Sequence, residues 1–393
     1  MSEIAIPTSQ NFTFELPTKL IFGCGTASQL PKHLKELNIN NPLILTGSTV
    51  SKLKQFKEMK QNLQENQINP TIWDEVISDP TEATIQEAAV KYQNCDCDGL
   101  LAFGGGSPMD TAKACGILIH HNEDSIIKFV GSEAKPITGA TPLICVPTTS
   151  GTGSEVTNVS VFTFTPLDRK VFLINKACYP KISVVDPELS YTMPKEVTAS
   201  TGLDALSHAI GCYTHEAGGT PISDALALYS IELVSKNLRK AVEDGGDVSA
   251  RVNMSLAATL AGIAFDHGGV HLEHSIGHVL GVKRKVPHGF SCLLLMPEIL
   301  EFIAPVKADR LAKIGEMLGM DVVGMSTEKA GEVAVLAVLK LMGDVGAPSL
   351  SDYGVGVDDI PALSEKCKNE MWSSPRAIDV SDFNQMFKKA LSR

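Results

Sequence analysis

Short apolar runs alternate with amphipathic segments through the first half of the chain. Five of the apolar runs have the length and flanking turn residues of buried strands, at 42–46, 71–76, 98–103, 143–146 and 182–185. Two of the intervening segments have apolar residues at helical spacing, 51–67 and 81–93. Strands and helices that take turns along a chain predict a parallel sheet covered by helices.

The pattern changes after Asp186-Pro187, where long helical periodicities such as 221–242 and 252–264 replace the short runs. Strand-like runs are scarce from there to the end. We therefore predict an α/β domain over residues 1–188, followed by an all-helical domain over residues 189–393.

A glycine run follows the predicted strand at 98–103. Gly104, Gly105 and Gly106 precede Ser107-Pro108, and Asp110 comes three residues after Ser107. Ser107 fits an N-cap, Pro108 fits the first helical position, and Asp110 suits the positive end of a helix. A helix that begins after bare backbone can bind an anion such as a pyrophosphate. The alternative is a structural strand-to-helix turn, and the run is not the GxGxxG fingerprint.

A second polar loop, PTTSGTGSE over 147–155, follows the predicted strand at 143–146. Thr148, Thr149 and Thr152 offer hydroxyls next to glycine backbone. Alone, such a loop is more often structural. Together with the glycine run on another strand of the same sheet, it favours a dinucleotide groove and hence a Rossmann-like dinucleotide-binding domain over 1–188.

Carboxylate and imidazole groups gather in the second half. Asp204 and His208 are four residues apart, so a helix would point both in the same direction. Five of the ten histidines lie in one short stretch, and the first four share one face if the stretch is a single helix; the five are His267, His271, His274, His278 and His288. Such a set suits Fe, Zn, Co or Ni. The alternative, a group of ordinary core histidines, explains this clustering poorly.

Composition excludes several classes of protein. The formal net charge of −11 argues against nucleic-acid or membrane-surface binding. The nine cysteines are scattered without a CxxC pair, so we expect neither disulfides nor a thiolate zinc site, and a reducing cytoplasm. The first twelve residues lack a signal-peptide pattern and no run of 18 apolar residues occurs, so we expect no export signal and no membrane span.

The GGGSPMDTAK turn, the PTTSGTGSE loop, the DxxxH pair and the H(x3)H(x9)HG region resemble the iron-containing (group III) alcohol dehydrogenases. The resemblance runs from Phe14 to Arg376. It implies four metal ligands, Asp204, His208, His274 and His288. It also implies a substrate-facing or proton-relay role for His278, and a nicotinamide cofactor on the 104–107 turn and the 148–153 loop, near Lys170. His267 and His271 match no ligand of that family.

The implied activity is a metal-dependent, NAD(P)-linked interconversion of a small aldehyde and its primary alcohol, with Fe2+ or alternatively Zn2+. We also expect a homodimer or a higher homo-oligomer. Two enzyme alternatives are a hydroxyacid-oxoacid transhydrogenase and a lyase of the dehydroquinate-synthase type. A third alternative is a metal-binding protein without catalysis.

The chain departs from the family pattern at three places. Gly211 stands where a glutamate is common, and His215 follows in an irregular segment. Gly47 replaces the aspartate that is typical of NAD-preferring members, and with Ser48 beside it this favours NADP(H) over NAD(H). Lys283, Arg284 and Lys285 precede the last ligand, which raises the alternatives of a solvated loop or an anionic substrate held by Arg284.

Overall fold

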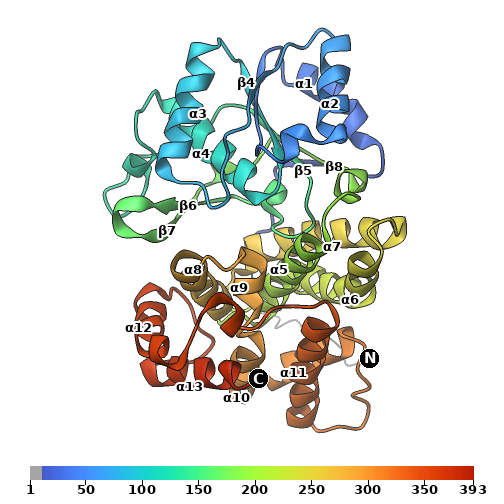
Figure 1. Cartoon of the computed structure of the whole chain (residues 1–393), viewed down its shortest axis with the longest axis vertical. Helices are drawn as coiled ribbons and strands as arrows, with labels where there is room; N and C mark the ends of the chain where they lie inside the picture. Colours follow the sequence, from blue (N-terminus) through green and yellow to red (C-terminus); the bar gives the residue numbers. More distant parts are fainter. Residues whose placement is uncertain (1–10) are drawn as a thin grey trace.

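The computed structural model describes residues 11–393. The first ten residues, which carry most of the segment without a signal-peptide pattern, lie outside the described part. The predicted fold class is confirmed, because a parallel sheet in the first half is followed by a helical second half (Figure 1).

The sheet has six parallel strands in the order β1-β8-β5-β4-β2-β3. The strands are β1 (Lys19–Phe22), β2 (Pro42–Leu45), β3 (Thr71–Trp73), β4 (Gly99–Gly104), β5 (Leu143–Pro147) and β8 (Ile182–Val185). The apolar runs located all of them except β1, a four-residue edge strand. An antiparallel hairpin, β6 (Val159–Phe164) with β7 (Arg169–Ile174), lies outside this sheet.

Alternation of side chains along the strands gives the sheet two buried faces. In β4, Leu100 and Ala102 pack in one apolar cluster, whereas Leu101 and Phe103 pack in another. The first cluster includes residues of α3 (Glu82–Asn94) and α4 (Gly106–His121). The second includes residues of α1 (Leu30–Glu36) and α2 (Lys54–Glu65). Burial on both faces explains why the strands are apolar runs without alternation.

The second half packs around one large apolar cluster. Its helices are α5 (Lys195–Thr214), α6 (Pro221–Glu243), α7 (Val248–Gly268), α8 (Leu272–Arg284), α9 (His288–Leu293), α10 (Met296–Met317), α11 (Thr327–Asp344), α12 (Ile360–Glu370) and α13 (Val380–Leu391). By length and composition alone, α7 and the stretch from α9 through α10 could each cross a membrane, with 61% and 72% of their most apolar windows buried inside the protein. Burial in the core accounts for their apolar composition.

The prediction of one helix carrying four histidines is wrong. His267 lies near the end of α7, whereas His274 and His278 lie on α8. Gly269 takes a left-handed φ of +80° and ends α7, which is a common role for glycine at a helix C-terminus. The chain then turns, and His271 stands just before α8 rather than on its metal-facing side.

Candidate active site

The glycine run lies between β4 and α4, against the second loop. The helix begins at Gly106 with Gly105 as its N-cap, so the prediction of Ser107 as the cap is wrong. The glycines are needed for close approach, because a Cβ on Gly106 would lie 2.9 Å from Thr152 Cγ2. A Cβ on Gly104 would lie 2.7 Å from Pro108 Cγ. The helix therefore starts two residues earlier than its polar residues indicate.

Asp110 anchors the second loop instead of capping the helix. Ser154 Oγ donates to Asp110 Oδ1 at 2.7 Å, and the backbone N–H of Val161 donates to Oδ2 at 3.2 Å. Lys113 is almost fully buried, and its Nζ donates to Ser154 Oγ at 2.9 Å and to Thr157 Oγ1 at 3.0 Å. Burial raises the pKa of Asp110, an effect that nearby Lys113 opposes. The role of Lys113 was missed, although it closes the GGGSPMDTAK motif.

The four predicted metal ligands come together from three helices. Asp204 and His208 lie one turn apart on α5, His274 lies on α8, and His288 begins α9. Asp204 Oδ1 is 3.7 Å from His208 Nδ1 and 3.8 Å from His288 Nε2. Three buried atoms here have no hydrogen-bond partner, Asp204 Oδ1, His208 Nδ1 and His274 Nε2. Orphaned, converging nitrogen and oxygen atoms fit a divalent cation, which would satisfy all of them.

The electrostatics of three of these residues, Asp204, His208 and His288, also fit a cation. Burial raises the pKa of Asp204 to about 7. Burial and the neighbouring imidazoles lower the pKa of His208 well below its usual range and that of His288 to about 3. Neutral imidazole is the form that binds metals, and a buried carboxylate gains most from a nearby positive charge.

Glu273, which the sequence analysis did not single out, supports the ligand His274. Its Oε1 accepts a hydrogen bond from His274 Nδ1 at 3.1 Å and another from the backbone N–H of His271 at 3.0 Å. Glu273 is completely buried, yet neighbouring His271 and His274 outweigh burial and lower its pKa to about 2. A carboxylate behind a ligating histidine fixes the orientation of the ring and the tautomer.

Gly211 on α5 makes room for this carboxylate. A Cβ at position 211 would lie only 2.0 Å from Glu273 Oε1. The departure from the family pattern at Gly211 is therefore accompanied by a change in packing, because a carboxylate from α8 fills the space beside α5.

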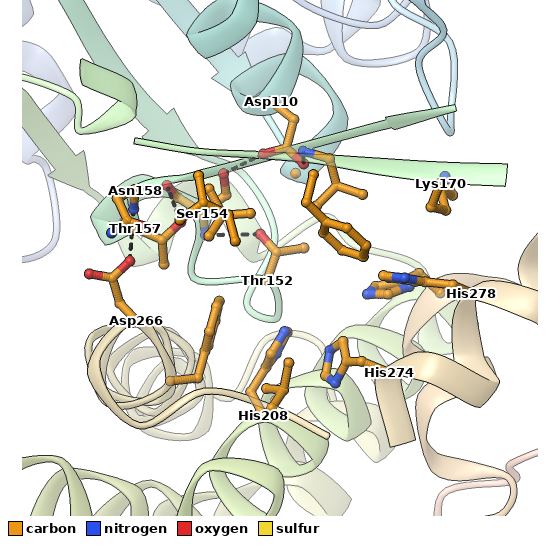
Figure 2. Close-up of a pocket in the computed structure, with 18 of the residues that line it drawn as sticks. Asp110, Thr152, Ser154, Thr157, Asn158, Lys170, His208, Asp266, His274 and His278 are labelled. Atoms are coloured by element: carbon orange, nitrogen blue, oxygen red, sulfur yellow. Dashed lines mark hydrogen bonds between the residues drawn. The ribbon is translucent and has the colours of Figure 1, made fainter. Parts of the chain in front are cut away.

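A cavity of about 580 Å³ joins the two halves of the site. Figure 2 shows His208, His274 and His278 on one side and Thr152 and Lys170 on the other. The lining includes three of the four ligand candidates, His208, His274 and His288, and five of the predicted cofactor residues, Gly106, Ser107, Asp110, Thr152 and Lys170. The other predicted cofactor residues lie outside this lining, at or just after the ends of β2, β4 and β5; they are Gly47, Ser48, Gly104, Gly105, Thr148 and Thr149.

His278 faces the cavity beside the ligand candidates. Its ring lies 5.4 Å from that of His288 and 5.5 Å from that of Trp372, measured between centroids. Its Nδ1 is buried without a hydrogen-bond partner. Burial, followed by the neighbouring His288 and His274, lowers the pKa of His278 well below its usual range. The lowered pKa favours the neutral ring.

The histidines that match no family ligand have other contacts. His271 Nε2 lies 2.8 Å from Thr214 Oγ1 on α5, which ties the start of α8 to that helix. His267 stacks on Phe14 at 4.0 Å between ring centroids. His215 lines the cavity, and its Nε2 lies 3.0 Å from Ser373 Oγ.

The basic residues before the last ligand contact acidic partners outside the cavity lining. Arg284 forms an ion pair with Asp359, and Lys283 forms one with Asp168 at 2.5 Å. Among the described residues that line the cavity, Lys170 is the only lysine or arginine, and it pairs with Asp79 at 2.5 Å.

Comparison with known proteins gives full-length relatives. NAD-dependent methanol dehydrogenase of Bacillus methanolicus is 35% identical over 96% of this chain and 99% of its own. The crystal structure of a 1,3-propanediol oxidoreductase is 31% identical, with a TM-score of 0.93 over 97% of this chain and 100% of that one. Sulfoacetaldehyde reductase of Bifidobacterium kashiwanohense, solved with NAD+, is 26% identical, with a TM-score of 0.87 over 98% and 100% of the two chains.

Two family profiles cover nearly the whole chain. The profile described as iron-containing alcohol dehydrogenase matches residues 17–187, and its C-terminal counterpart matches residues 198–391. Residues from both matched ranges line one cavity, among them Gly106 from the first range and His208, His274 and His288 from the second. The chain belongs to the iron-containing alcohol dehydrogenase family.

Proposed function

We propose that this protein is a metal-dependent, nicotinamide-linked oxidoreductase that interconverts a small uncharged aldehyde and its primary alcohol. One observation carries the proposal. The cavity that contains Gly106 and Thr152 of the cofactor-binding loops also contains the imidazoles of His208, His274 and His288. A hydride donor and a metal would therefore act on one bound molecule.

Asp204, His208, His274 and His288 would hold one divalent metal, proposed as iron from the family. When bound, the metal supplies Lewis-acid polarisation of the carbonyl oxygen, and the reduced nicotinamide supplies the hydride. Glu273 keeps the His274 ring oriented through its hydrogen bond to Nδ1.

His278 is proposed as the proton carrier. Its ring lines the cavity and its Nδ1 has no hydrogen-bond partner, so that nitrogen is proposed to accept a proton from the alcohol when the reaction runs toward the aldehyde. The protonated ring then returns a proton in the reverse direction. Phe172 and Trp372 pack near it, with ring centroids at 5.1 and 5.5 Å, and give this side of the cavity an aromatic wall.

The walls of the cavity support an uncharged substrate. Phe172, Phe265 and Trp372 line it, together with the aliphatic side chains of Val270 and Ile174. The one lining lysine is already paired, so an anionic group would be desolvated without a free cation. We therefore propose a neutral aldehyde, and not the anionic substrate that the basic run raised as one of two alternatives.

We propose NAD(H) as the preferred cofactor, against the expectation drawn from Gly47. Gly47 forms a β-bridge with Glu75, and Ser51 Oγ donates to Asp74 Oδ2 at 2.8 Å. Asp74 directly follows β3, and its carboxylate contacts the loop after β2. It would repel a 2′-phosphate there, as an aspartate at position 47 would.

Steady-state assay with added NADH separates the candidate reactions. The metal-loaded protein, given excess NADH and a neutral aldehyde such as propanal, is expected to oxidise one NADH per alcohol formed over many turnovers. A lyase that regenerates its cofactor would leave the NADH absorbance unchanged. A transhydrogenase would consume added NADH only up to one equivalent per site and would need a hydroxyacid donor for further turnover. Either result would overturn the proposal.

A further inference from the structure

A fifth metal-binding side chain lies against the proposed ligands. Cys292 follows His288 by one turn of α9 and is 1% exposed. Its Sγ lies 3.8 Å from both ring nitrogens of His288. One ligand atom from each of Asp204, His274, His288 and Cys292 can be chosen so that all lie within 4.8 Å of one another. Nothing in the family resemblance assigns this thiol a role.

The cluster therefore contains two overlapping sets of four donors. Asp204, His274 and His288 are common to both. The set completed by His208 opens to the cavity, because His208 lines it. The set completed by Cys292 replaces this cavity-lining imidazole with a thiol that is absent from the described residues lining the cavity.

The spacing suits a four-coordinate ion in either set. Asp204 Oδ1 is 3.7 Å from His208 Nδ1, and His288 Nε2 is 3.8 Å from both Asp204 Oδ1 and Cys292 Sγ. Tetrahedral zinc holds nitrogen, oxygen and sulfur ligands about 3.3–3.7 Å apart, as follows from its bond lengths. Gly277 leaves space for the thiol, since a Cβ there would lie 2.6 Å from Cys292 Sγ.

We propose that Cys292 is an alternative metal ligand that captures thiophilic ions. With Zn2+ or Cd2+, Cys292 joins Asp204, His274 and His288 in a closed site, and His208 is left out. The metal–sulfur bond forms as the thiol proton leaves to solvent, without any change of oxidation state. Fe2+ and Mn2+ have less preference for sulfur and take the set with His208. Zinc held by four protein ligands stays four-coordinate in structural sites, whereas Fe2+ accepts further ligands beside those of the protein. The thiol therefore separates a catalytic metal from an inhibitory one.

Cobalt is the direct probe, because a thiolate bound to Co2+ gives an intense charge-transfer band in the near ultraviolet. The metal-free protein, loaded with one equivalent of Co2+, is expected to show the band. Cys292→Ser should abolish it while one Co2+ remains bound. Cys212→Ser is the matched control, since Cys212 is equally buried on α5 but is not part of the four-donor group, and it should keep the band.

Chelator competition gives a second readout that does not depend on turnover. Cys292→Ser is expected to weaken Cd2+ and Zn2+ binding by about 10- to 100-fold or more, because even residues that only hydrogen-bond to a metal ligand contribute that much to affinity. Mn2+ binding should weaken far less. Cys292→Ala, with circular dichroism, separates ligand loss from misfolding. A fully loaded cobalt protein without the band, or a Cys292→Ser protein that keeps it, would overturn the proposal. Both results leave the proposed oxidoreductase function untouched.

Discussion

Gly211→Ala is the smallest change that tests how the ligand His274 is held. The added Cβ would stand 2.0 Å from Glu273 Oε1 and 2.7 Å from its Cδ. Ordinary contact needs about 3.5 Å, so the carboxylate must move by more than an ångström. It then loses its hydrogen bonds to His274 Nδ1 and to the backbone N–H of His271, in a place without water to replace them.

The magnitude follows from those two hydrogen bonds. Each involves a charged acceptor and contributes about 1.5–3 kcal/mol, whereas exchanging glycine for alanine within a helix returns only about 1 kcal/mol. We expect a net loss of roughly 2–5 kcal/mol in the free energy of unfolding of the metal-free protein. Release of the His274 ring should also weaken metal binding about 10- to 100-fold.

Denaturant unfolding and chelator competition measure the two effects. Gly281→Ala is the matched control, because its Cβ would meet only Val286 O at an ordinary 3.8 Å. That variant should match the parent protein or exceed its stability slightly. In a Glu273→Ala background, Gly211→Ala should add little further loss, since the clashing carboxylate is gone. Full metal affinity in Gly211→Ala, or equal losses from Gly211→Ala with and without Glu273, would refute the reasoning.

Three further predictions address neighbouring residues. His271→Ala should keep one metal per chain and should lose about 1–3 kcal/mol of stability, because the buried hydrogen bond to Thr214 is removed. Loss of the bound metal would instead mean that His271, and not His274, is the metal ligand. Arg284→Ala should change kcat/KM equally, within about twofold, for a semialdehyde and for a neutral aldehyde of the same length, because its partner is Asp359; a selective loss on the anionic substrate would restore Arg284 as a substrate contact. Asp74→Ser should raise kcat/KM with NADPH relative to NADH about tenfold, by removing a carboxylate near the loop after β2; a parent enzyme that already prefers NADPH would contradict this.

The pattern of apolar residues predicted most of the fold, because strands that are buried on both faces of the sheet appear in the sequence as continuous apolar runs. The continuous apolar character of 98–103 follows from Leu100 and Leu101 facing different buried clusters. The short edge strand β1 lacks such a signal. The prediction of one helix carrying four histidines failed for a related reason. The spacing of residues alone does not reveal the left-handed turn at Gly269.

The chemistry-bearing residues were recognisable one by one, but their partners were not. Asp110 was placed at a helix end by its spacing, yet it serves the loop at Ser154, 44 residues away. Glu273 fills space created by Gly211, 62 positions earlier, and neither residue alone indicates the other. In the sequence, Cys292 was only one of the scattered cysteines, because its closeness to Asp204 depends on how α5 and α9 pack. Such pairings are set by tertiary packing.

Metal dependence of NADH oxidation tests the central claim most directly. The protein is stripped of metal anaerobically, reloaded with Fe2+ in steps, and assayed with NADH and a neutral aldehyde while bound metal is counted. Turnover should be absent without metal, rise in proportion to occupancy, and saturate at one ion per chain. His274→Ala should lose both the bound ion and the turnover. Full turnover in the metal-free protein, or stoichiometric metal and parent activity in His274→Ala, would contradict the assignment of Asp204, His208, His274 and His288 as the metal site that carries the reaction.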